Sequence, residues 1–147
     1  SGNRKLSEFL FEMALSNITR PSSATAILFI PSTRKRTYLL KRNPAKEWAH
    51  FLGKKWNLPV FHRSIEIAEK SNESKTLNLE NRLLKSDRFR APADAELIQN
   101  KNEEIILVDD LMTTGNTLRR AVLAISNLGN RSCVQRIHVV TLGLRSR

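Results

Sequence analysis

The sequence predicts an α/β domain in which an open, mainly parallel sheet is flanked by helices. Short aliphatic runs that suit buried strands alternate with longer stretches that carry apolar residues at helical spacing. Residues 104–144 read as strand, loop, helix and strand, which is the order of a right-handed crossover unit of a parallel sheet. The chain has 147 residues, and neither a repeat nor a long linker divides it, so we expect one domain over residues 1–147.

The first predicted elements are a helix and a buried strand. The pattern over residues 3–17 indicates an amphipathic helix within an N-terminal segment of residues 3–20, and Pro21 breaks it. The apolar stripe of this helix, which we expect to face the core, consists of Leu6, Phe9, Leu10, Met13 and Ala14. Residues 24–30, ATAILFI, are then typical of a buried strand that Pro31 halts.

A second helix is predicted after a polar, basic loop. Asn43 followed by Pro44 is a typical helix start, and Asn57 and Pro59 end the pattern. The apolar face between these signals consists of Ala45, Trp48, Ala49, Leu52 and Trp56. We expect both tryptophans to be packing residues.

The middle of the chain carries weaker signals. Residues 60–67, VFHRSIEI, alternate loosely between apolar and polar and are compatible with a strand. Residues 68–82 are polar and interrupted, which predicts a loop that could close over a site. A short helix-like stretch lies around residues 80–86.

The C-terminal part has the clearest pattern. Residues 104–110, EIILVDD, predict a buried strand, and residues 136–144, RIHVVTLGL, predict the next strand. Apolar residues at helical spacing indicate a helix between these strands, and Gly129 ends the pattern. These residues are Leu118, Ala121, Val122, Ile125 and Leu128.

Composition narrows the functional classes. The chain carries 25 Lys and Arg against 14 Asp and Glu, a net charge of +11, which favours polyanionic partners such as nucleotides, nucleic acids or phosphates. We expect a soluble, cytoplasmic protein, because no apolar run could span a membrane and no signal-peptide pattern is present. Ser1 and Gly2 resemble a cleavage scar. The single cysteine, Cys133, is expected to be a small half-buried residue, and His50, His62 and His138 lack metal-ligand spacing.

Residues 109–117 are the candidate binding site. Ligands of open parallel sheets bind beyond the carboxyl ends of the strands, where Asp109 and Asp110 are expected to end the strand. Threonines and Gly115 then lead into a helix N-terminus, whose N–H groups and positive dipole end favour an anion. Threonine hydroxyls add donors, and Gly115 permits close approach of the backbone.

The two halves of this loop favour different chemical groups. The helix N-terminus favours a phosphate, whereas ionised carboxylates only accept hydrogen bonds and would repel a bare phosphate. A sugar with a terminal phosphate and vicinal hydroxyls satisfies both halves, so the loop is interpreted as a ribose-5-phosphate cradle. The alternative is an ordinary strand that ends in a solvated acidic turn.

Residues 105–117, IILVDDLMTTGNT, resemble the signature of type I phosphoribosyltransferases over all their positions. The resemblance implies the Rossmann-like fold of that family, here with a minimal hood, and binding of phosphoribosyl pyrophosphate. It implies that Asp109 and Asp110 contact the ribose hydroxyls and act as the catalytic residues. The residues implied around the 5-phosphate are Thr113, Thr114, Gly115, Asn116 and Thr117.

Other segments resemble one branch of that family, the ComF-type competence proteins and their amidophosphoribosyltransferase-like relatives. These segments are residues 29–36, 41–59 and 76–82. The resemblance implies a basic pyrophosphate loop that contains Ser32, Thr33, Arg34 and Lys35. It also implies Mg²⁺ held mainly by substrate oxygens, without a metal site built from protein side chains.

The implied reaction is displacement of pyrophosphate from the anomeric carbon of the ribose by a nucleophile, which the sequence does not identify. Two alternatives stay open. One is a nucleic-acid-binding accessory protein of DNA uptake, which would bind single-stranded DNA, and the other is a regulator that senses phosphoribosyl pyrophosphate. The basic residues that favour the first are Arg34, Lys35, Arg36, Lys41, Arg42 and Lys46, although a solvated face is the simpler interpretation of that run. A homodimer also stays open.

Overall fold

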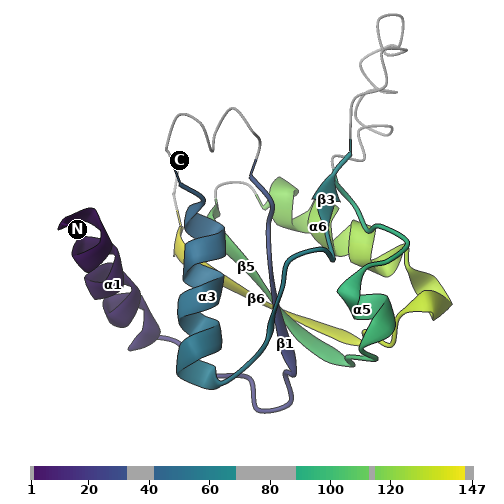
Figure 1. Cartoon of the computed structure of the whole chain (residues 1–147), viewed down its shortest axis with the longest axis horizontal. Helices are drawn as coiled ribbons and strands as arrows, with labels where there is room; N and C mark the ends of the chain where they lie inside the picture. The colour runs from purple at the N-terminus through teal and green to yellow at the C-terminus, as the bar shows by residue number, and fades with distance from the viewer. Residues whose placement is uncertain (1, 33–41, 69–88, 113–114, 145–147) are drawn as a thin grey trace, which may run out of the picture.

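In the part of the chain that the structure describes, four parallel strands form the central sheet (Figure 1). The computed structural model describes residues 2–32, 42–68, 89–112 and 115–144. The strands are β1 (Ala26–Phe29), β2 (Val60–Phe61), β5 (Glu104–Met112) and β6 (Arg136–Leu144), and their order in the sheet is β2-β1-β5-β6. The open, parallel sheet flanked by helices confirms the predicted fold class.

Helices cover both faces of the sheet. The helices are α1 (Gly2–Leu15), α3 (Pro44–Trp56), the short α5 (Glu96–Gln99) and α6 (Asn116–Ser126). Ile106 and Val108 of β5 belong to the same apolar cluster as Trp48 of α3. Ile105 and Leu107 lie in the cluster that contains Leu118, Ala121 and Ile125 of α6. Since successive side chains of a strand point to opposite faces, α3 and α6 lie on opposite sides of β5. In the described ranges, no helix combines the length and the apolar character that crossing a membrane requires.

Helix α3 begins and ends at the predicted residues. The Asn43 side chain caps the helix, because its Oδ1 accepts a hydrogen bond from the Lys46 backbone N–H at 3.1 Å. Asn57 ends it in the left-handed conformation, with φ 54°. Trp48 is fully buried and Trp56 is partly buried, so the prediction that both tryptophans pack against the core is confirmed.

The prediction of one strand over residues 60–67 is wrong. The chain bends at residues 62–64, which separates β2 from β3 (Glu66–Ile67). Strand β2 joins the main sheet, whereas β3 pairs antiparallel with β4 (Phe89–Arg90). The predicted loop over residues 68–82 lies outside the described residues apart from its first position, and the stretch around residues 80–86 lies outside them completely.

The apolar stripe of α1 does not face the core as predicted. Its large members are more than half exposed: Leu6 58%, Phe9 60%, Leu10 52% and Met13 55%. The helix is anchored instead by Phe11, whose ring centroid lies 5.1 Å from that of Trp48. Because α1 rests on α3 and the edge of the sheet, only the side that carries Phe11 is covered. Cys133, expected to be half-buried, is exposed.

Gly53 packs α3 tightly against the start of β2. A Cβ atom at this position would lie 2.7 Å from Val60 Cγ2 and 2.9 Å from the Leu58 carbonyl oxygen. We expect Gly53→Ala to destabilise the chain by about 1–2 kcal/mol, because the clash with backbone outweighs the gain in helix propensity. Thermal unfolding measures this effect. The exposed neighbour Lys54 supplies the control Lys54→Ala, and equal melting temperatures of the two variants would contradict the prediction.

Candidate functional site

The site residues lie where the strand order of the sheet reverses. The chain leaves β1 toward β2 on one side, through α3, and leaves β5 toward β6 on the other side, through α6. The reversal therefore falls between β1 and β5, which pair directly. The Ile30 N–H donates to the Val108 carbonyl oxygen at 2.9 Å, so the segment after β1 begins beside Asp109. In open α/β sheets this crevice at the carboxyl ends of the strands is where ligands bind.

The sequence pattern predicted that Asp109 and Asp110 end the strand, and this prediction is wrong. Both aspartates lie within β5. The strand continues to Met112, and its pairing with β6 extends through Asp109↔Thr141 and Leu111↔Gly143. The strand is longer than expected because β6 supplies backbone partners up to Leu144. The acids therefore stand on paired, rigid backbone near the carboxyl end of the central strand.

The carboxylates leave β5 on opposite faces of the sheet. Asp109 follows the alternation of Ile105 and Leu107, which places its side chain on the α6 face, where the residue is only 6% exposed. Its Oδ1 accepts a hydrogen bond from the Asp110 backbone N–H at 2.8 Å. Asp110 is half-buried on the face that α3 covers. A ligand can contact both acids if it crosses from one face of the sheet to the other just past the end of β1, whose last residue, Phe29, pairs with Val108.

The N-terminus of α6 follows the carboxyl end of β5 in the chain. Gly115 precedes the helix in the left-handed conformation, with φ 76°. Gly115, the N-cap residue, has no side chain that could cap this end, and the first turn of the helix holds no acidic residue, so no charge within the described helix offsets the positive end of its dipole. A Cβ atom at Gly115 would meet no atom of the described residues within 4 Å. Asn116 is exposed and Thr117 is half-buried at this end, whereas Thr113 and Thr114 lie outside the described residues.

Of the residues predicted to bind pyrophosphate, the structure describes only Ser32. The buried Oγ of Ser32 has no hydrogen-bond partner among the described residues. An unpaired buried hydroxyl costs about 1–3 kcal/mol, so a ligand oxygen is a favourable partner for it. Thr33, Arg34 and Lys35 lie outside the described residues.

Of the basic run over residues 34–46, the structure describes residues 42–46. There Arg42 forms an ion pair with Glu47 and donates a hydrogen bond to Ser7 Oγ at 2.7 Å. The Arg42 guanidinium thus holds α1 against the start of α3. These contacts assign Arg42 a structural role, and binding of nucleic acid by the rest of the run stays a prediction.

Two histidines meet near the carboxyl end of β2. The ring centroids of His50 and His62 are 4.9 Å apart, and His62 also packs edge-on against Phe29. Burial lowers the pKa of His50, and His62 and Lys46 lower it further by charge repulsion. The third histidine, His138, lies 3.0 Å from a Glu104 carboxylate oxygen. No group of three or more His, Cys, Asp and Glu in the described ranges could hold a metal ion.

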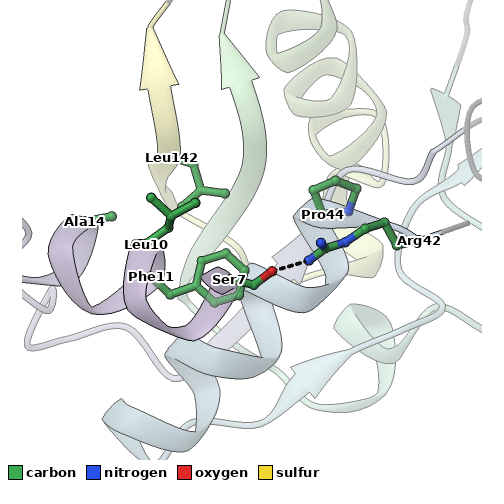
Figure 2. Close-up of a pocket in the computed structure, with 7 residues that line it drawn as sticks. All are labelled: Ser7, Leu10, Phe11, Ala14, Arg42, Pro44 and Leu142. Atoms are coloured by element: carbon green, nitrogen blue, oxygen red, sulfur yellow. Dashed lines mark hydrogen bonds between the residues drawn. The ribbon is translucent and has the colours of Figure 1, made fainter. Parts of the chain in front are cut away.

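A cavity that the sequence did not predict opens beside the site (Figure 2). It has a volume of about 360 Å³ and lies between α1, the start of α3 and β6. Its lining consists of Ser7, Leu10, Phe11, Ala14, Arg42, Pro44 and Leu142. Leu142 shares an apolar cluster with Val108, so this cavity is on the same face of the sheet as Asp110. Three segments far apart in sequence line it, and therefore no linear motif marks it.

Comparisons with known proteins found likeness only among solved structures. No family model and no curated protein matches the chain. The chain is similar to an orotate phosphoribosyltransferase from Aeropyrum pernix, with 11% identity and a TM-score of 0.48 over 97% of this chain and 72% of that one. It is also similar to a purine phosphoribosyltransferase from Pyrococcus horikoshii Ot3, with 18% identity and a TM-score of 0.45 over 92% and 70% of the respective chains. These values describe a distant likeness in architecture.

Proposed function

We propose that the chain binds phosphoribosyl pyrophosphate together with Mg²⁺ and transfers the phosphoribosyl group with release of pyrophosphate. One observation carries the proposal: an acidic pair near the carboxyl end of β5 and the N-terminus of α6, which follows β5, lie where the strand order reverses. A phosphorylated sugar is the ligand that uses both groups, because hydroxyls donate to carboxylates and a phosphate accepts from backbone N–H groups.

Each part of the ligand has a proposed position. The 5-phosphate lies at the N-terminus of α6, where Gly115 gives the backbone close access and Thr113, Thr114, Asn116 and Thr117 supply further donors. The ribose hydroxyls donate to Asp109 and Asp110. The pyrophosphate extends toward the segment after β1, where the buried Oγ of Ser32 has no hydrogen-bond partner among the described residues and Thr33, Arg34 and Lys35 follow in sequence.

The reaction requires little covalent chemistry from the protein. The bond between the anomeric carbon and the pyrophosphate oxygen breaks, the pyrophosphate leaves with the bonding electrons, and a lone pair of the acceptor forms the new bond. Positive charge develops on the ribose during this displacement. Carboxylates fixed on paired backbone stabilise that charge without reorganising, so Asp109 and Asp110 are the proposed catalytic residues.

Substrate oxygens are the proposed ligands of Mg²⁺. The described residues offer no cluster that would hold the ion without the substrate, whereas phosphate oxygens are ligands that Mg²⁺ prefers. When bound, the ion neutralises charge on the leaving pyrophosphate.

Isothermal titration calorimetry tests the binding step. We expect the chain to bind phosphoribosyl pyrophosphate in the presence of MgCl₂ at one site per chain. Ribose 5-phosphate should bind at the same site, but more weakly because it lacks the pyrophosphate contacts. A chain that is folded by circular dichroism and binds neither ligand would refute the proposal.

A further inference from the structure

Two histidines from different elements come together on the surface of the fold. His50 lies in the middle of α3, and His62 follows Phe61, the last residue of β2. The centroids of their imidazole rings are 4.9 Å apart, and the ring planes make an angle of 39°. Their separation in sequence fits no linear metal-binding motif, so only the fold reveals the pair.

The fold fixes the backbone of both histidines. His50 follows Ala49, which is fully buried on the side of α3 that packs against the sheet. The backbone N–H of His62 donates to Glu96 Oε1 at 2.8 Å, and the His62 ring packs edge-on against Phe29 with 5.6 Å between the centroids. Both histidines are nevertheless exposed, so a dissolved ion and its water ligands can reach their ring nitrogens.

The distance between the rings matches that of two imidazoles that share one metal ion. A Zn²⁺ ion lies about 2.0–2.1 Å from a ligating histidine nitrogen, and the centre of the ring lies roughly 1 Å behind that nitrogen. At a tetrahedral angle the two ring centres are then roughly 5 Å apart, which agrees with the observed 4.9 Å. Rotation of the exposed rings about χ2 can turn one nitrogen of each toward the shared ion.

We propose that His50 and His62 form a binding site for one divalent transition-metal ion of the Zn²⁺ class, with water molecules completing its coordination. Imidazole nitrogen suits Zn²⁺, Ni²⁺ and Cu²⁺, whereas Mg²⁺ prefers oxygen ligands. The site is therefore separate from the Mg²⁺ of the proposed function, on which this inference does not rest. The bound ion joins α3 to the segment that follows β2.

Charged groups around the pair set its protonation and its affinity. Only a neutral imidazole binds a metal ion, and burial lowers the pKa of His50, as do the charges of His62 and Lys46. The Glu96 carboxylate accepts hydrogen bonds from the backbone N–H groups of His62 and Arg63 and adds negative charge at the end of β2. Lys46 repels a cation, so we expect a dissociation constant in the micromolar range, weaker than at closed four-ligand zinc sites.

Isothermal titration calorimetry with ZnCl₂ tests the inference. The untagged Cys133→Ser chain is used, because the exposed thiol of Cys133 could itself bind the ion. We expect one Zn²⁺ per chain, and a large excess of MgCl₂ should not compete. His50→Gln and His62→Gln should each weaken binding at least about tenfold. The matched control is His138→Gln, which removes a histidine that contacts Glu104 instead and should leave Zn²⁺ binding unchanged.

Thermal unfolding and NMR test the geometry. Since the ion joins two segments only in the folded chain, ZnCl₂ should raise the melting temperature of the Cys133→Ser chain but not that of its His50→Gln/His62→Gln variant. Addition of Cu²⁺ should broaden the ring signals of His50 and His62 more than those of His138. The inference is overturned by a chain that does not bind Zn²⁺, by binding that survives loss of both histidines, or by equal broadening of all three.

Discussion

Replacing both acids in the variant Asp109→Asn/Asp110→Asn is expected to abolish measurable binding of phosphoribosyl pyrophosphate. Each carboxylate is proposed to accept charge-assisted hydrogen bonds from the ribose, and such bonds contribute about 1.5–3 kcal/mol each. The pair should therefore lower the affinity by about a hundredfold or more. Calorimetry with MgCl₂ present measures the loss, and thermal unfolding establishes that the variant is folded.

The matched control for this variant is Glu103→Gln. Glu103 is exposed and precedes the opposite end of β5, about 20 Å from Asp109 for a strand rise of ~3.3 Å per residue. The Glu103→Gln change also removes one carboxylate, but far from the proposed site, so binding should remain as in the wild type. Equal weakening by both changes would point to a general effect of charge and would contradict the assignment of the acids to the ribose.

The largest effect on stability is expected from Trp48→Ala. Trp48 is completely buried on the α3 face of the sheet, and its ring packs against Phe11 at 5.1 Å and stacks on Phe51 at 5.6 Å. Removing a buried indole typically costs about 3–5 kcal/mol, a large share of the total stability of a domain. Urea denaturation should show this loss, and α1 should detach early because Phe11 loses its partner.

Trp48→Phe separates lost packing from lost hydrogen bonding. The indole Nε1 of Trp48 is buried and has no hydrogen-bond partner within the described ranges, so phenylalanine removes no favourable polar contact. We expect a loss below about 1.5 kcal/mol. A Trp48→Ala variant as stable as Trp48→Phe would show that the contacts with Phe11 and Phe51 contribute little.

The C-terminal crossover was predictable because its signals are local. The run before Asp109 is continuously aliphatic, the stripe of α6 has a helical period, and residues 136–144 form β6 over the predicted range. The expectation of a ligand site at the carboxyl end of β5 rests on parallel topology alone. The fold class could therefore be predicted from the sequence.

Elements that depend on distant contacts could not be predicted. The chain bends after β2 because the Glu96 carboxylate accepts hydrogen bonds from the backbone N–H groups of His62 and Arg63, both at 2.8 Å. Glu96 lies more than thirty positions away in sequence, so the alternation of residues 60–67 gave no sign of this bend. The apolar stripe of α1 has the period of a core helix, and only the arrangement of α3 and β6 shows which side of α1 is covered.

The orientation of the two acids also required the structure. The sequence places Asp109 and Asp110 side by side, but the extension of β5 to Met112 turns them to opposite faces of the sheet. A ribose that contacts both must therefore cross the sheet just past the end of β1, and this restricts where its phosphate and its pyrophosphate can lie.

A crystal structure of the chain with phosphoribosyl pyrophosphate and Mg²⁺ tests this account most directly. We predict electron density for the 5-phosphate at the N-terminus of α6 beside Gly115, for the ribose hydroxyls against Asp109 and Asp110, and for the pyrophosphate near Ser32. Density for the ligand at any other surface, with this crevice empty, would contradict the account.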